Sequence, residues 1–152
     1  MAFVGFTGPI ILDVPADPAA MFLVRALVGK ISERIGFEAE EIDQLVLAVD
    51  EACTNVIRHA YAGVGAGRII LTFTPSSDYF EVMIRDFGKG ADPAGFEGRD
   101  LDELRPGGLG IHFIKSVVDN LEYTVPPGGG TVLKMMKFMP KQEKHKIEHT
   151  SQ

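Results

Sequence analysis

A carboxylate, an amide and a cation recur at helical spacing in the middle of the chain. Glu51, Asn55 and Arg58 stand four and three residues apart, with His59 next to the arginine, so a helix would carry them on one face. A carboxylate can accept a proton, and an amide oxygen can ligate a hard cation such as Mg²⁺. A solvated helix face with an i,i+4 pair has the same spacing, so this stretch alone leaves both interpretations open.

A second acidic group stands at the end of a strand-like run. Asp86 is followed by Gly88 and Gly90. A carboxylate in this place can accept a hydrogen bond from an exocyclic amine, and glycines let a flat ring approach the backbone because they carry no Cβ. Asp-x-Gly-x-Gly also occurs as an ordinary turn, which is the structural alternative.

A third cluster, the glycine-rich run at 107–110, opens a helix-like segment. Free backbone N–H groups and the helix dipole make a helix N-terminus a phosphate-binding site. Arg105 and Lys89 could add positive charge there, whereas a plain helix entry would explain the glycines without a ligand. The chain has no Gly-x-x-x-x-Gly-Lys-Ser/Thr loop, which excludes a P-loop enzyme. It also lacks a Gly-x-Gly-x-x-Gly after its first strand, which disfavours a dinucleotide-binding fold.

Two helices are predicted in the first half of the chain. One runs from the Asp17-Pro18 start to Gly36, because aspartate caps a helix, proline suits its first position and glycine ends it. Its buried stripe is expected to hold Met21, Phe22, Val24, Leu27, Val28 and Ile31. The other starts near 38–42 and continues through 45–61. Its apolar stripe consists of Leu45, Val49, Ala52, Val56 and Ala60.

Five strands and a third helix account for the other apolar runs. The strands are predicted near residues 10–14, 68–74, 80–85, 121–125 and 131–139, and the helix opens at 107–110. Short turns join the strands into two hairpins, and hairpins imply antiparallel pairing. We therefore predict an α+β two-layer sandwich whose mixed, mostly antiparallel sheet is covered on one face by helices.

The composition fits one domain, assigned to residues 1–140, with 141–152 as a polar, disordered tail. The 152 residues are 45% hydrophobic and carry a net charge of −6. These values indicate a packed core and argue against a dedicated nucleic-acid binder. No run suits a membrane span or a signal peptide, so we expect a cytoplasmic protein without a membrane partner. The single cysteine, Cys53, is expected to be a buried, inert thiol.

Three segments together resemble a known family. Glu-Ala-Cys-Thr-Asn-Val-Ile-Arg-His-Ala-Tyr at 51–61, Asp-Phe-Gly-Lys-Gly at 86–90 and Gly-Gly-Leu-Gly-Ile at 107–111 look like the N, G1 and G2 boxes of the GHKL (Bergerat-fold) ATPases. The resemblance covers about residues 10–139. A short stretch between the last two boxes, and one domain without phosphoacceptor helices, make the chain similar to the anti-sigma factor serine/threonine-protein kinases of bacterial partner-switching systems.

The resemblance implies a role for each matching residue. Glu51 would be the general base that takes a proton from a serine hydroxyl, and Asn55 would hold the Mg²⁺ that bridges the phosphates of ATP. Asp86 would bind the adenine amino group, and Thr131 could help through a water. The other residues expected to bind the nucleotide are Arg58, Gly88, Gly90, Arg105, Gly107, Gly108, Leu109, Gly110 and Ile111.

The resemblance also makes residues 91–106 an ATP lid, with Arg105 near the γ-phosphate. Glycine, charge and the lack of periodicity predict that this is the most mobile internal segment and that nucleotide orders it. Pro106 departs from the expected pattern and should stiffen the end of the lid.

The implied function is ATP-dependent phosphorylation of a serine in an anti-sigma-factor antagonist of the STAS type, together with sequestration of a sigma factor. An exposed first strand could also pair across a homodimer. One alternative is a module that binds ATP and a partner but transfers nothing, and Glu51 counts against it. The other is a stand-alone histidine-kinase-type ATPase domain, which the short lid disfavours.

Overall fold

The computed structural model describes residues 6–61, 67–88 and 109–140, and its strands form one five-stranded sheet. The strands are β1 (Ile10–Pro15), β2 (Arg68–Pro75), β3 (Tyr79–Asp86), β4 (Asn120–Thr124) and β5 (Thr131–Phe138). Their order across the sheet is β1-β2-β3-β5-β4. All four pairings are antiparallel, so the parallel pairing that a mixed sheet would include does not occur between the described strands.

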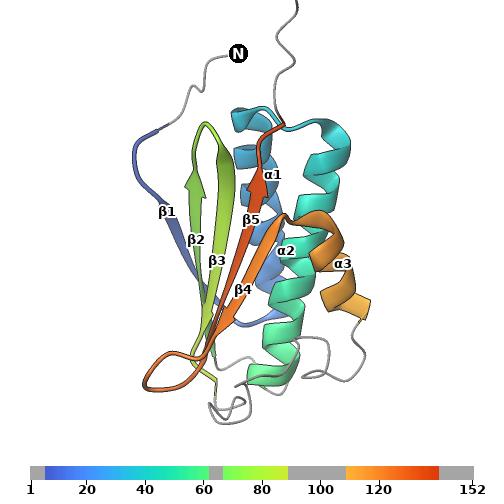
Figure 1. Cartoon of the computed structure of the whole chain (residues 1–152). Helices are drawn as coiled ribbons and strands as arrows, with labels where there is room; N and C mark the ends of the chain where they lie inside the picture. Colours follow the sequence, from blue (N-terminus) through green and yellow to red (C-terminus); the bar gives the residue numbers. More distant parts are fainter. Residues whose placement is uncertain (1–5, 62–66, 89–108, 141–152) are drawn as a thin grey trace, which may run out of the picture.

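The α-helices lie on one face of this sheet, which confirms the predicted two-layer α+β fold (Figure 1). A short 3₁₀ turn, η1 (Pro18–Ala20), leads into α1 (Met21–Ile35). The long helix α2 (Ala39–Ala60) packs against α1 on one side and against α3 (Leu109–Val117) on the other. α2 is therefore the central element of the helical layer.

Local capping chemistry sets the helix boundaries close to where the sequence predicts them. The Asp17 carboxylate accepts a hydrogen bond of 2.9 Å from the N–H of Ala19. Glu38 and Glu41 form a reciprocal capping box at the start of α2. Gly36 ends α1 with a φ of 102°, a left-handed conformation that glycine adopts without a steric penalty.

The core lies between the two layers and follows the two expected periodicities. Alternate residues of the central strands are buried, namely Ile69, Leu71 and Phe73 of β2 and Phe80, Val82 and Ile84 of β3. They face the stripe of α2, in which Leu45, Val49, Ala52 and Val56 are buried. Phe22 departs from the predicted stripe of α1, because its side chain is 58% exposed. It lies about 100° around the helix from the buried Met21, which turns it away from the sheet.

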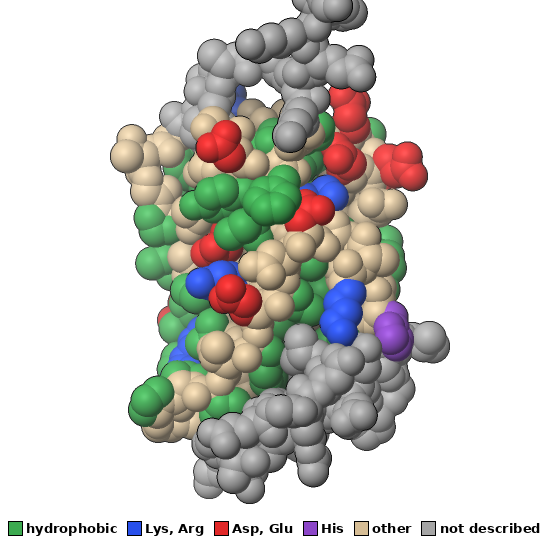
Figure 2. All heavy atoms as spheres, in the orientation of Figure 1, with side chains coloured by type: hydrophobic (Ala, Val, Ile, Leu, Met, Phe, Trp, Pro, Cys, Tyr) green, Lys and Arg blue, Asp and Glu red, His purple; other side chains and the backbone are tan. Residues whose placement is uncertain are grey.

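The opposite face of the sheet is more open. Ile11 and Phe138 are 65% and 55% exposed, and none of the described helices covers them. On the side of the molecule drawn in Figure 2, acidic and basic side chains are interspersed with hydrophobic ones. Within the described ranges, no helix combines the length and apolar character needed to cross a membrane.

Candidate functional site

The predicted chemical groups lie on three elements, the C-terminal half of α2, the end of β3 and the first turn of α3, and α2 contacts both of the others, towards the lower end of the molecule in Figure 1. Glu51 and Asn55 stand one turn apart on α2. Asn55 is buried, with 7% of its surface exposed, and Glu51 is half-buried. Because the carboxylate is half-buried and the amide is buried, this face of α2 is not the fully solvated helix face that was the alternative interpretation of the spacing.

Glu51 lies directly against α3. A Cβ added at Gly110 would lie 2.4 Å from the Oε1 atom of Glu51, so only a glycine leaves room for the carboxylate in this position. Leu47, Glu51, Gly110 and Phe113 line a shallow cavity of about 310 Å³ between the two helices. The Glu51 side chain therefore lines this cavity between α2 and α3.

The first turn of α3 is formed by Leu109, Gly110 and Ile111. The N–H groups of a first helical turn have no intrahelical acceptor, so this turn can donate hydrogen bonds to an anion. The side chain of Ile111 is 3% exposed and belongs to the core, so its contribution to a site is limited to its backbone. Gly110 joins this turn to Glu51, which places the donors and the carboxylate side by side.

Asp86 ends β3 as a buried carboxylate with 1% of its surface exposed. Its Oδ1 accepts a hydrogen bond of 3.0 Å from the N–H of Gly88, and its Oδ2 accepts one from the hydroxyl of Thr131, its partner residue on β5. No described Lys or Arg forms an ion pair with it. Each carboxylate oxygen can accept two hydrogen bonds, and each has one donor among the described residues, which leaves capacity for another.

Two glycines fix the backbone around Asp86. A Cβ at Gly130, where φ is +72°, would lie 2.1 Å from the carbonyl oxygen of Asp86. A Cβ at Gly88 would lie 2.3 Å from the carbonyl oxygen of Ala60 at the end of α2. Gly88 therefore allows β3 to approach α2, which is a packing reason for the glycine in addition to the predicted approach of a flat ring.

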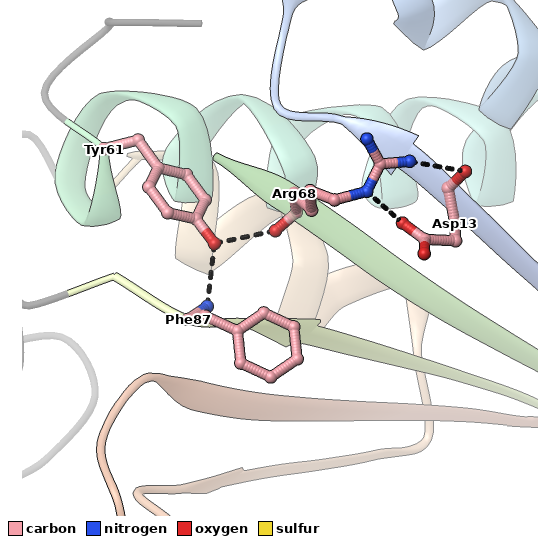
Figure 3. A network of polar contacts seen from close by, with 4 residues as sticks. All are labelled: Asp13, Tyr61, Arg68 and Phe87. Atoms are coloured by element: carbon pink, nitrogen blue, oxygen red, sulfur yellow. Dashed lines mark hydrogen bonds and ion pairs between the residues drawn. The ribbon is translucent and has the colours of Figure 1, made fainter. Parts of the chain in front are cut away.

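Tyr61, which the sequence assigns no role of its own, connects three elements at this end of the molecule. Its hydroxyl donates a hydrogen bond of 2.7 Å to the carbonyl oxygen of Arg68 and accepts one of 2.7 Å from the N–H of Phe87 (Figure 3). Arg68 in turn pairs with Asp13 of β1 through an Nε–Oδ1 distance of 2.6 Å. The sequence signals for Tyr61 are its position immediately after α2 and its place at the end of the 51–61 segment that resembles the N box.

The described structure does not place several of the predicted site residues in the site. Arg58 lies in the last turn of α2 and is exposed. Gly90, Arg105, Gly107 and Gly108, together with Lys89, the expected lid at 91–106 and the tail at 141–152, lie outside the described residues. Their roles stay predictions.

Cys53 takes no part in this site. It is fully buried in α2, and burial, followed by the charge of Asp50, raises the pKa of its thiol to about 12. At neutral pH the thiol stays protonated, so it is a poor nucleophile. The prediction that the thiol is buried is confirmed.

Comparison with known proteins decides the family. The family described as the histidine kinase-like ATPase domain matches residues 14–137, which is more than half of the chain. The chain belongs to this family. This family is part of the GHKL ATPase superfamily, so the resemblance predicted from the three segments is confirmed. Membership of this family implies the use of ATP.

Two relatives of this chain indicate its branch of the histidine kinase-like ATPase family, that of the serine-protein kinases. A serine-protein kinase RsbW from Halalkalibacterium halodurans is 32% identical over 140 residues, covering 87% of this chain and 84% of the relative. Another RsbW, from Bacillus pumilus, is 29% identical over 151 residues, covering 91% and 88%. The chain thus matches these kinases over nearly their whole length.

A solved structure shares the fold. The structure of the RsbU and RsbW domains of a Mycobacterium tuberculosis protein superposes with a TM-score of 0.61 and 19% identity. The match covers 87% of this chain and 32% of the other chain, so the present chain spans about a third of that longer protein.

Proposed function

We propose that this protein is an ATP-dependent serine protein kinase that phosphorylates an anti-sigma-factor antagonist of the STAS type and sequesters a sigma factor. The observation that carries the proposal is the half-buried Glu51 side chain, which lines the cavity between α2 and α3 and lies one turn from the buried Asn55. The relatives that match this chain over most of its length are named serine-protein kinases, which supports the same activity.

The side chains present fit ATP and Mg²⁺. Asn55 supplies a hard oxygen donor of the kind that Mg²⁺ prefers and would hold the ion. Asp86 retains acceptor capacity for the adenine amino group, and the first turn of α3 offers N–H donors to phosphates. When bound, ATP would supply the phosphoryl group and Mg²⁺ would neutralise charge on its phosphates.

The chain's own contribution to the reaction is a base and a set of positioning contacts. Glu51 would accept the proton of a serine hydroxyl that enters the cavity beside it. Gly110 keeps the space that the Glu51 carboxylate occupies next to the phosphate-binding turn. Asp86 would fix the adenine at the other end of the site, which sets the direction in which the phosphates extend.

The experiment that tests the proposal incubates the protein with labelled ATP, Mg²⁺ and each candidate antagonist from its own genome. A kinase gives acid-stable label on a serine of one antagonist. A binding module gives ATP-dependent co-purification of an antagonist without label. A histidine-kinase-type ATPase gives acid-labile label on histidine, so acid treatment separates the two labelled outcomes and co-purification without label identifies the third.

Gly110→Ala tests the contact between the phosphate-binding turn and the base. The added methyl group should displace the Glu51 carboxylate, whose Oε1 would lie 2.4 Å away, and should slow transfer roughly 10- to 100-fold. Thermal stability should not fall, since alanine favours a helix by about 1 kcal/mol over glycine. ATP affinity should hold because the N–H of residue 110 remains.

The matched control for this variant is Gly29→Ala on α1. A Cβ there would lie 3.7 Å from the Val46 side chain, an ordinary contact, so transfer should be unchanged. Single-turnover transfer and ATP titration on both variants make the comparison. Normal transfer by Gly110→Ala would show that the position of the Glu51 carboxylate is unimportant.

A homodimer also forms part of the proposal. β1 lies at an edge of the sheet and pairs only with β2 among the described strands, so its outer backbone N–H and C=O groups can pair with a second copy. Sedimentation at micromolar concentration should give twice the mass of one chain, and a monomer under those conditions would remove this part of the proposal.

A further inference from the structure

The C-terminal end of α2 holds both residues that follow Asp86. The N–H of Phe87 donates to the Tyr61 hydroxyl at 2.7 Å, and Gly88 packs so closely on Ala60 that a Cβ there would lie 2.3 Å from its carbonyl oxygen. Ala60 and Tyr61 are the last residue of α2 and its C-cap. Two consecutive residues of the helix end therefore contact two consecutive residues after the carboxylate.

The Tyr61 side chain is itself fixed from two other directions. Its hydroxyl donates to the Arg68 carbonyl oxygen at 2.7 Å, at the start of β2. Its ring lies over Gly67, where a Cβ would come within 2.3 Å of a ring carbon. Because the Arg68 side chain pairs with Asp13 of β1, the acceptor of this bond belongs to a strand that is anchored in the sheet (Figure 3).

These contacts bear on the direction of the Asp86 carboxylate. Its Oδ1 accepts from the N–H of Gly88, so a shift of residues 87 and 88 would move one of the two donors that orient it. The other donor, the Thr131 hydroxyl, lies on β5 and does not depend on Tyr61. Loss of the Tyr61 hydroxyl should thus loosen one side of the carboxylate and leave the other in place.

We propose that Tyr61 is a positioning residue for base recognition, which holds the 86–88 segment so that the Asp86 carboxylate faces the amino group of adenine. The inference rests on the proposed role of Asp86 in the nucleotide site. Both hydrogen bonds of the hydroxyl lie at exposed positions, so water can replace the hydroxyl as a partner without a large loss of stability. The role of Tyr61 is therefore in geometry more than in folding.

The test compares ATP with inosine triphosphate, which carries no exocyclic amino group, by calorimetric titration of the full chain. Tyr61→Phe keeps the ring and removes only the bridging oxygen. It should weaken the binding of ATP about three- to tenfold, the usual effect of losing one hydrogen bond, and leave the binding of inosine triphosphate nearly unchanged. The rate of transfer at saturating ATP should stay at the wild-type value, because Glu51 is untouched.

Two further variants sharpen the result. Tyr79→Phe removes a tyrosine hydroxyl at the opposite end of β3. It should leave the ratio of ATP affinity to inosine triphosphate affinity unchanged. Gly67→Ala displaces the Tyr61 ring from the backbone side and should lower the ratio as Tyr61→Phe does. Melting temperatures of all variants report folding separately, and Gly67→Ala provides a second reading should Tyr61→Phe prove unstable.

The outcomes separate this inference from the proposed function. The role of Tyr61 alone would be overturned if Tyr61→Phe weakened the binding of both nucleotides equally. It would also be overturned if Tyr61→Phe left the ratio of ATP affinity to inosine triphosphate affinity unchanged while Asp86→Asn lowered that ratio. A wild-type protein that binds both nucleotides equally would overturn the role of Asp86 and the inference with it. A ratio that falls in Tyr61→Phe and Gly67→Ala but not in Tyr79→Phe supports it.

Discussion

Glu51→Gln should bind ATP with Mg²⁺ as the unaltered protein does, yet transfer phosphate to a serine roughly 10²–10⁴-fold more slowly, the usual contribution of a positioned general base. The amide has nearly the shape of the carboxylate, so α2 and the contact with Gly110 should survive. What is lost is the capacity to accept a proton. Partner binding should persist, because it depends on the nucleotide-bound shape and not on proton transfer.

Two further variants on α2 serve as comparisons for Glu51→Gln. Asp50→Asn changes the neighbouring carboxylate, which pairs with Arg25 at 2.9 Å on the surface, and should leave transfer unchanged. Asn55→Ala removes the proposed metal ligand and should weaken Mg²⁺-dependent nucleotide binding as well as turnover. Single-turnover assays beside binding titrations measure all three. Transfer at the wild-type rate by Glu51→Gln would rule out the proposed mechanism.

Asp86→Asn should weaken the binding of adenine nucleotides roughly 10- to 100-fold, as expected for the loss of a hydrogen bond to a charged group. It should weaken the binding of guanine nucleotides much less. The reason lies in the donors around the carboxylate. The N–H of Gly88 can only donate, so the amide oxygen must face it, and the amide NH₂ then faces Thr131. On that side a donor replaces the acceptor that an incoming amino group needs.

Calorimetry with ATP, ADP and GTP measures this prediction, and a melting curve controls for folding. Thr131→Val is the matched variant, because it removes one donor to the carboxylate and leaves the charge in place. It should weaken ATP less than Asp86→Asn does. An ATP affinity that Asp86→Asn leaves unchanged would remove Asp86 from the nucleotide site.

The sequence by itself determines the elements and most of the chemical groups of this protein. The 3.6-residue period of α2 and the two-residue period of β3 are each set by neighbours along the chain, and capping residues such as Asp17 and Glu38 act within a few positions. For the same reason, local patterns alone are enough to place Glu51 and Asn55 on one helix face and Asp86 at a strand end.

Only the tertiary structure decides which of these groups meet. Asp86 and Thr131 are 45 residues apart, and they touch because β5 pairs with β3 and lies between β3 and β4, an order that local patterns do not encode. The contact between Gly110 and Glu51 depends on how α3 packs against α2, and the bridge from Tyr61 to Phe87 joins residues 26 apart. Such contacts depend on how whole faces pack together, since burial of apolar area favours compact layers without specifying partners along the chain.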